Sequence, residues 1–380
     1  MGAAFGLGGV LRFPALCLEY GGAFVVAYAA VCVFAAFPLL CAELSLGRRV
    51  KSAFPLKAIC PCGGAVGGLS AINSAAMCLC YAVIICVLSV RACTFYANVN
   101  YGYPADMPQL SPFIAALVFI ALAFFLTRRA GVRAALARAA VIFQAALFAV
   151  LAVRGLTYRN CPAALGSVLA VGGATLCSPG VWLSALGQAL LSLSLAAGVM
   201  PSFAADMPQT LSPARASAAI IAANFFGSLL CAVATLSLAA GSGNLTALSH
   251  SALSNALTLY PAALAHAFSN GYMCGAFGTA FYLSLTLTAF VSALSLARPA
   301  YVWASCAPVS RRTSAFGLCA ALFTLCLPFA LGADFSFVDS FCCNIVAPLA
   351  AAGELGCFLF YALTKRKRGD RIDIWKILNT

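Results

Sequence analysis

The sequence has very few charged residues. Only 8% of its 380 residues are Asp, Glu, Lys or Arg, and 9 acidic residues stand against 22 basic ones. A typical soluble domain has about 25% charged residues, so this composition excludes an ordinary soluble protein. The sequence also lacks the regular alternation of apolar and polar residues that marks an outer-membrane β-barrel. The composition therefore favours an all-α integral membrane protein.

Histidine is almost absent. The only two, His250 and His266, lie far in sequence from the pairs Cys60-Pro61-Cys62 and Cys342-Cys343. Most of the 19 cysteines fall in apolar stretches, where free cysteine behaves as a small hydrophobic side chain. The apolar stretches also contain no combination of residues that could serve as a catalytic nucleophile and its general base. We therefore expect no resident metal centre and no enzyme.

Long apolar runs are abundant, because 63% of the residues are hydrophobic. A membrane-spanning helix needs about 20 mostly apolar residues. On this basis the sequence predicts ten transmembrane helices. They cover Ala3–Tyr20, Phe24–Leu46, Leu69–Val90, Phe113–Leu126, Ala134–Val153, Val181–Phe203, Ala218–Ala239, Cys274–Leu296, Ala315–Leu331 and Cys342–Leu363.

Basic residues gather in every second loop between these spans. Arg or Lys follows the second, fourth, sixth, eighth and tenth spans, whereas the loops between hold few charges. Cytoplasmic loops carry the excess of Lys and Arg, so we expect a multi-pass cell-membrane protein with both termini in the cytoplasm. The net charge of +13 is explained by basic residues in the loops of a protein in a lipid bilayer, so we expect no nucleic-acid partner.

Two of the predicted spans contain residues that interrupt a helix. The stretch 2–14, which includes most of the first span's N-terminal half, has four glycines, Pro14 and the charged Arg12, and the sixth span has Gly187, Gly198 and Pro201. Unwound backbone is tolerated in a membrane only where protein buries it or a cavity adjoins it, and a charge inside a span indicates a functional site. Broken spans at matching positions of two halves are typical of secondary transporters. We expect a 5+5 inverted repeat with broken helices 1 and 6, made of residues 1–153 and 154–364, and a cytoplasmic tail at 365–380.

Several motifs resemble those of one transporter family. Residues 6–14 (GLGGVLRFP) and 21–24 (GGAF) resemble the first-span signature of the neurotransmitter:sodium symporters, roughly GLGNxxRFP…NGGGAF. Residues 38–47 (PLLCAELSLG) resemble the family's PLxxxExxxGQ, and residues 179–194 are similar to its sixth span. The resemblance implies sodium-coupled symport of an amino acid or related amine by alternating access.

The resemblance implies an amino-acid site beside the two broken spans. Backbone amides of Leu7 and Gly8, with the Tyr81 hydroxyl, would hold the carboxylate, because free amides at a helix N-terminus attract anions. The ammonium would meet carbonyl or hydroxyl oxygens of Ala4, Leu191, Ser192 and Ser194. The substrate side chain would meet Met77, Leu191, Ala197, Ser292 and Leu296. Because Ala196 and Ala197 are small, we expect large aliphatic or aromatic substrates.

Two sodium sites follow from the same resemblance. The first would use the Ala4 carbonyl, Ser192, Asn224 and the substrate carboxylate. The second would use the carbonyls of Gly2, Phe5 and Thr288 and the hydroxyl of Ser292. Gly9 and Val291 stand where the family has asparagine and threonine, so each site lacks one side-chain oxygen. Both sites are expected to be weakened, with the Thr288 hydroxyl or water as substitutes.

The chloride pattern of the family is better matched. Tyr28, Gln188, Ser192 and Ser228 correspond to the chloride-dependent members, whereas chloride-independent members carry an acidic residue in place of one serine. A negative charge close to bound sodium balances it in a low dielectric. The resemblance therefore implies chloride as a second ion required for transport.

The resemblance also implies an extracellular gate in which Arg12 pairs with Asp339, since desolvated charges in a membrane need partners. Glu43 and Glu354 are expected either to brace unwound backbone or to pair structurally.

Two other functions stay open. A proton-coupled or uniport permease of the same fold is favoured by Gly9 and Val291. A non-transporting amino-acid sensor is favoured because Cys306 stands where the family has the acid of its cytoplasmic gate.

Overall fold

The computed structural model describes most of the chain as helix. The described residues are 8–50, 55–104, 110–159, 161–208, 210–245, 248, 255–305, 309–330 and 346–367. Every regular element in these ranges is a helix, as the apolar composition predicts.

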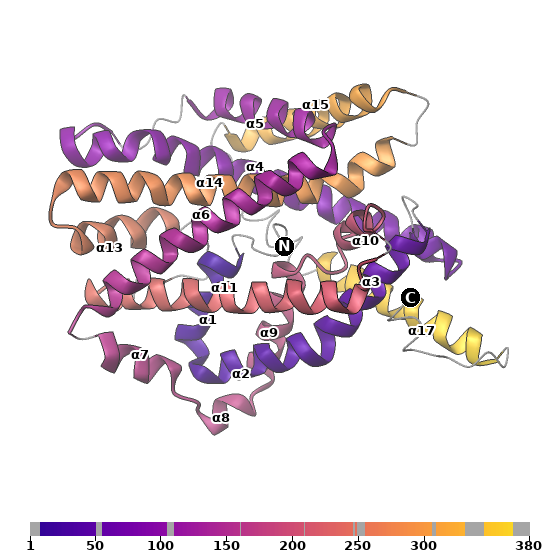
Figure 1. The fold of residues 1–380 in the computed structure, drawn as a ribbon, viewed down its shortest axis with the longest axis horizontal. Coiled ribbons are helices and arrows are strands. Elements are labelled where there is room, and N and C mark those ends of the chain that lie inside the picture. The colour runs from indigo at the N-terminus through magenta and orange to yellow at the C-terminus, as the bar shows by residue number, and fades with distance from the viewer. Residues whose placement is uncertain are drawn as a thin grey trace.

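Two long helices form the centre of the molecule. Helices α4 (Gly63–Tyr101) and α14 (Gly271–Ala304) run side by side along its length (Figure 1). Ser74 Oγ of α4 donates to Leu296 O of α14 at 2.8 Å. A Cβ at Gly278 would overlap the ring of Phe95, so glycine is what lets the two backbones approach. Both helices extend beyond the spans predicted for them, because helical hydrogen bonding continues through their polar ends.

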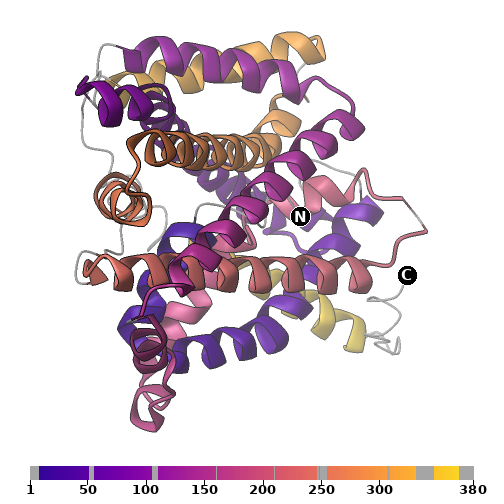
Figure 2. The same cartoon turned by 60° about the vertical axis from the view of Figure 1, so that its left-hand side comes forward.

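Other helices pack around this pair. Helix α6 (Ala130–Leu156) crosses diagonally between α14 and α11 (Pro213–Gly241) (Figure 1). Helices α5 (Ser111–Leu126) and α15 (Arg311–Ala330) pack on each other as an outer pair in both views (Figures 1 and 2). Their large exposed apolar side chains, including Phe113 and Leu325, are what a lipid-facing surface requires.

Helices α1 and α2 lie on the opposite side of α11 from α14 (Figure 1). Both η1 and α1 contact α11, and α2 packs along α9. Val10 and Leu11 of η1 belong to the apolar cluster that also holds residues of α4 and α14. The bounds are η1 Gly8–Arg12, α1 Phe13–Tyr20, α2 Gly22–Val31, η2 Cys32–Ala36, α3 Phe37–Val50 and α9 Pro179–Ser192. The remaining elements are η3 Pro55–Ala58, α7 Cys161–Leu169, α8 Gly173–Leu176, η6 Asn255–Leu259, α13 Tyr260–Ala267 and α17 Ala347–Lys367.

A non-helical segment separates α9 from α10 (Val199–Ala204). This segment, residues 193–198, falls within the run predicted as the sixth span. Ser194, Ala196 and Gly198 have φ values of 51°, 57° and 68°. Non-glycine residues rarely adopt positive φ, and they do so mostly where the surrounding structure holds them and function requires it. The segment is therefore a candidate for a binding site.

Six helices are long and apolar enough to cross a membrane. They are Gly22–Val50, Gly63–Tyr101, Ala130–Leu156, Pro213–Gly241, Gly271–Ala304 and Arg311–Phe329, with Ser111–Leu126 and Pro348–Tyr361 as shorter apolar helices. All eight overlap predicted spans. The count of ten and the inverted repeat stay predictions.

Candidate functional site

A buried polar cluster joins three helices. Tyr28 Oη of α2 lies 3.0 Å from Ser192 Oγ at the end of α9. Asn224 Nδ2 of α11 donates to Tyr28 Oη at 2.7 Å and to Ser192 Oγ at 3.2 Å. The structure thus brings together two residues predicted for chloride and one predicted for sodium.

One hydroxyl hydrogen of this cluster is not used in the hydrogen bonds between its members. Tyr28 and Ser192 each have one hydroxyl hydrogen, and one of the two fills the contact between them. Asn224 supplies its own hydrogens to both oxygens. The thiol of Cys32 also lies beside Tyr28, but a thiol sulfur is a weak acceptor. One hydroxyl hydrogen is therefore available to a stronger acceptor, such as an anion.

The other two predicted chloride residues lie against η1. Gln188 Nε2 of α9 donates to Gly8 O at 3.0 Å. A Cβ placed on Gly9 would lie 2.6 Å from Ser228 Oγ and 3.9 Å from Asn224 Oδ1. A side chain at Gly9 would therefore require the Ser228 hydroxyl to turn away, because Ser228 Oγ occupies the space beside Gly9.

Three residues of the predicted ion sites have a buried oxygen without a hydrogen-bond partner among the described residues. These atoms are Asn224 Oδ1, Gln188 Oε1 and Ser292 Oγ. A buried polar atom that stays unpaired costs about 1–3 kcal/mol. Such oxygens suit a bound cation or water, because either would satisfy them.

A glutamine that the sequence analysis did not single out lies beside Thr288. Gln144 of α6 is fully buried, and its Oε1 contacts Thr288 Oγ1 of α14. Thr288 Oγ1 also lies 2.9 Å from Ser284 O, and a hydroxyl has only one hydrogen to give. If the Thr288 hydroxyl donates its hydrogen to Ser284 O, it cannot also donate to Gln144. Gln144 Nε2 has no partner in the described part of the chain. Rotating the Gln144 amide by half a turn lets Nε2 donate to Thr288 Oγ1. The amide oxygen of Gln144 is then free.

Three of the five predicted contacts of the substrate side chain belong to one large apolar cluster or pack against it. Ala197 and Leu296 are in its buried core, and Met77 of α4 packs against it, as does Tyr81. Ser292 stands one helical turn before Leu296 on α14 and is also buried. The cluster extends over several other helices, so a common substrate site for these residues stays a prediction.

Two further predicted substrate contacts lie at the start of the non-helical segment. Leu191 and Ser194 are both partly buried there. Leu191 lies in the last turn of α9 and Ser194 in the non-helical segment, on either side of Ser192 in sequence.

A glutamate holds the backbone of the non-helical segment. Glu43 Oε1 of α3 accepts a hydrogen bond from Ala196 N at 2.8 Å. Glu354 of α17 lies next to it and accepts from Ser70 Oγ at 3.4 Å. Both acids are buried. Glu43 thereby fixes one of the residues with positive φ.

Five predicted site residues lie outside the described residues: Gly2, Ala4, Phe5, Leu7 and Asp339. Their roles, and the pairing of Arg12 with Asp339, stay predictions. Arg12 itself ends η1 and is half-buried.

An apolar groove of about 330 Å³ lies elsewhere, between η2, α3, α9 and α17. Its lining includes Phe34, Leu39, Leu186 and Leu355 and none of the residues predicted for substrate. Phe34 is among the most exposed apolar residues, so the groove opens to the surface that lipid would cover.

Comparisons with known proteins agree with these observations. Residues 1–100 match the model of the Sodium:neurotransmitter symporter family. Mouse Sodium-dependent neutral amino acid transporter B(0)AT3 is 28% identical over 278 residues, which cover 62% of this chain and 45% of the mouse protein. The Uncharacterized sodium-dependent transporter YhdH of Bacillus subtilis (strain 168) is 27% identical over 251 residues, covering 61% of this chain and 55% of that protein. The chain spans about half the length of these curated relatives. Both are named as transporters, not as enzymes.

The fold also has a solved counterpart. A crystal structure of MhsT in complex with L-phenylalanine superposes with a TM-score of 0.77, at 21% identity, over 92% of this chain and 85% of that one. The likeness shows that the two chains share a fold. With the six apolar helices, it makes this chain a multi-pass membrane protein.

Proposed function

We propose that the chain belongs to the sodium:neurotransmitter symporter family, on the match of residues 1–100 and the shared fold. In this proposal it is a secondary active transporter that couples uptake of an amino acid or related amine to sodium and chloride. The observation that carries the proposal is the set of buried, unpaired oxygens at Asn224, Gln188 and Ser292. These atoms lie on α11, α9 and α14, the helices on which the ions are expected to bind.

The proposed mechanism is alternating access by a 5+5 inverted repeat. In this arrangement α9 and α10 are the halves of one interrupted span, and η1 with α1 continues the other. Ten spans place both termini on one side of the membrane, and the basic residues in every second loop favour the cytoplasmic side. Secondary transporters bind their cargo where such helices are discontinuous, and the positive φ values at 193–198 support a site there.

Sodium would be held by oxygens alone, as expected of a hard cation. At the second site the side chain lost at Val291 is replaced, in this proposal, by the amide oxygen of Gln144. Three observations support this: Gln144 is buried, it touches Thr288, and its amide can turn to free that oxygen. Ser292 Oγ, buried and unpaired one turn later on α14, would be its neighbour in the site.

Chloride would sit near Tyr28, Gln188, Ser192 and Ser228. The remaining hydroxyl hydrogen of the Tyr28–Ser192 pair supplies one donor. Gln188 Nε2, now bonded to Gly8 O, supplies another after a small rotation. No carboxylate belongs to this set of four, so an anion is needed to balance sodium in a low dielectric.

The substrate is proposed to carry a large aliphatic or aromatic side chain. The small Ala197 belongs to the apolar cluster against which Met77 and Tyr81 pack, and a small side chain at this position favours a substrate with a larger one. The related fold of MhsT was solved with L-phenylalanine.

Uptake by the purified chain in lipid vesicles tests this function. We expect amino-acid accumulation that needs an inward sodium gradient and falls when gluconate replaces chloride. A thermal-shift screen of amino acids, with sodium and chloride varied independently, identifies the substrate beforehand. Ser192→Ala should abolish ion-dependent stabilisation, whereas Ser237→Ala should keep it, because Ser237 is equally buried but bonds to Ala234 O of its own helix.

A proton-coupled or uniport permease of the same fold is the alternative, favoured by the missing side-chain oxygens at Gly9 and Val291. Uptake that does not depend on sodium and is driven by a proton gradient would support the proton-coupled permease. Substrate binding without any flux would indicate a sensor instead.

A further inference from the structure

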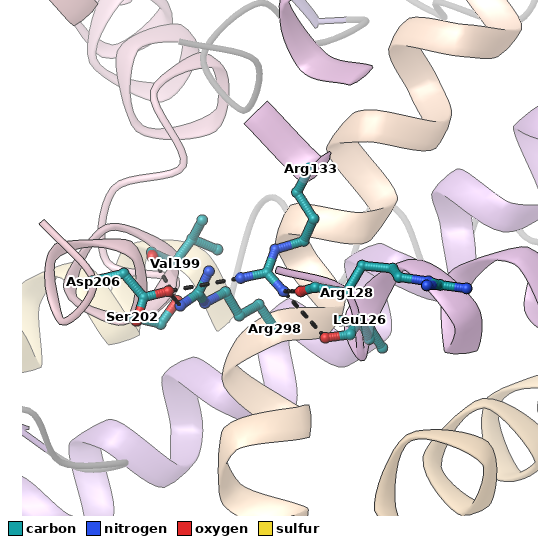
Figure 3. A network of polar contacts seen from close by, with 7 residues as sticks. All are labelled: Leu126, Arg128, Arg133, Val199, Ser202, Asp206 and Arg298. Atoms are coloured by element: carbon teal, nitrogen blue, oxygen red, sulfur yellow. Dashed lines mark hydrogen bonds and ion pairs between the residues drawn. The ribbon is translucent and has the colours of Figure 1, made fainter. Parts of the chain in front are cut away.

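Three charged side chains meet where α10 ends. Asp206 Oδ2 lies 2.5 Å from Arg298 Nη2 of α14 and 3.6 Å from Arg133 Nη2 of α6 (Figure 3). The two arginine side chains are only 11% and 16% exposed, against 48% for Asp206. One carboxylate therefore ties the end of a short helix to two of the long helices.

Both arginines are fixed by further contacts. Arg133 Nη1 donates to Leu126 O at 3.1 Å and to Arg128 O at 2.6 Å, at the end of α5 (Figure 3). Arg298 lies over the ring of Phe203, a residue of α10, at 4.6 Å, which is a cation–π contact. Arg298 thus holds α10 both through Phe203 and through Asp206.

The charges make this contact depend on the position of α10. Two largely buried guanidinium groups face a single carboxylate, and a guanidinium–carboxylate pair is among the stronger hydrogen-bonded contacts. If α10 moved away, Asp206 would leave with it and Arg133 and Arg298 would face each other across the gap. That arrangement is unfavourable, so the cluster favours the packed position of α10.

The cluster also lies close to the candidate substrate site. Arg298 follows Leu296 by two residues on α14, and α10 follows directly on the segment that contains Ala197. Arg133 lies in the first turn of α6, shortly after Arg128 and Arg129, whose loop is predicted to be cytoplasmic from its basic residues. The cluster therefore lies at the end of the site that is predicted to face the cytoplasm.

We propose that Asp206, Arg298 and Arg133 form a latch that keeps the cytoplasmic side of the substrate site closed while α10 is packed against α14 and α6. The role of the latch in closing the substrate site rests on the proposed transport function. Its effect on the packing of α10 does not depend on that function. Breaking it increases the fraction of molecules in which α10 is released. A partly exposed ion pair contributes about 1 kcal/mol, which corresponds to roughly a fivefold change in that equilibrium.

Hydrogen–deuterium exchange of the whole chain in lipid nanodiscs tests the latch without any substrate. Asp206→Asn and Arg298→Gln should each raise the exchange rate of residues 199–206 by about fivefold. The double variant should exchange more slowly than the product of the two single effects predicts, because both changes remove the same Asp206–Arg298 pair. Arg138→Gln is the matched control, since Arg138 is exposed on α6 and belongs to none of these contacts. Thermal melting confirms that each variant is folded.

Unchanged exchange in both single variants, a strictly additive double variant, or an equal rise in Arg138→Gln would overturn the latch. Uptake assays separate this result from the proposed function. If the wild type does not transport but the exchange pattern holds, the latch stands and the transport proposal fails. If the wild type transports but the variants do not show the expected exchange pattern, the transport proposal stands and the latch fails.

Discussion

Gly9 offers the sharpest test of the site, because a side chain there would collide with the Ser228 hydroxyl in its present position. A Cβ at this position would lie 2.6 Å from Ser228 Oγ, far closer than an ordinary van der Waals contact, and 3.8 Å from Ser228 Cβ. The neighbouring Gly8 differs, since a Cβ there would meet only Gln188 Nε2, at 4.0 Å. Both glycines belong to η1, so Gly8→Ala is a matched control for Gly9→Ala.

The expected effect follows from these distances. Adding an atom to a well-packed interior costs about 1–3 kcal/mol, while replacing glycine by alanine in a helix gains about 1 kcal/mol. The gain is common to both variants, so the difference between them isolates the clash with Ser228. We expect Gly9→Ala to be less stable than Gly8→Ala by about 1–3 kcal/mol. Ser228→Ala removes Oγ, and the double variant with Gly9→Ala should recover the stability of Gly8→Ala.

Thermal melting of the purified variants in detergent, followed by tryptophan fluorescence, measures this difference. The reasoning is refuted if Gly9→Ala and Gly8→Ala melt at the same temperature, or if Ser228→Ala fails to rescue Gly9→Ala. A confirmed clash would explain physically why this chain lacks the family's asparagine: Gly9 and Ser228 share one space.

Three further predictions concern binding. Gluconate in place of chloride should depress substrate binding or uptake, and Ser228→Glu should restore it by supplying a fixed negative charge; equal wild-type activity in both anions would show that the chloride site is not functional. Tyr81→Phe should weaken substrate affinity about tenfold, because a hydrogen bond to a charged group contributes about 1.5–3 kcal/mol; unchanged affinity in a binding titration would contradict its role. Gln144→Leu should raise the sodium concentration needed for half-maximal binding by about tenfold, through the loss of one contact to a charged group. Ser284→Ala is its control and should change that concentration little, because the Ser284 hydroxyl bonds to Phe281 O; an equal effect of both variants would argue against a sodium ligand at Gln144.

The apolar runs of the sequence are sufficient to predict the helices. Eight predicted spans overlap long or apolar helices, because a run of about 20 apolar residues has few other stable forms in a membrane. The interruption before α10 is predicted from Gly198 and Pro201. The start of the interruption is not predicted. Ser194 and Ala196 adopt positive φ there, and the sequence around a non-glycine residue does not indicate that conformation.

The candidate site could be predicted in part. The family motifs point to Tyr28, Ser192 and Asn224, and the structure brings these three into hydrogen-bonding contact. Gln144 and Arg298 were missed, because their roles depend on how α6, α10 and α14 pack together, which no pattern along the chain encodes. A signal did exist for Gln144: it is the one uncharged polar side chain inside the apolar span Ala134–Val153, and polar residues inside a span are functional candidates.

The contacts of one short segment explain how the separate sites could act together. Ser192 ends α9 inside the polar cluster, Ala196 is held by Glu43, and Ala197 belongs to the apolar cluster. The same segment leads directly into α10, whose far end is tied down through Asp206. Residues with positive φ cost of order 1–3 kcal/mol each unless their surroundings hold them, so this segment keeps its shape only while these contacts persist. An ion or substrate that binds at Ser192 or Ala197 therefore acts on the backbone that positions α10, which gives binding a direct physical route to the latch.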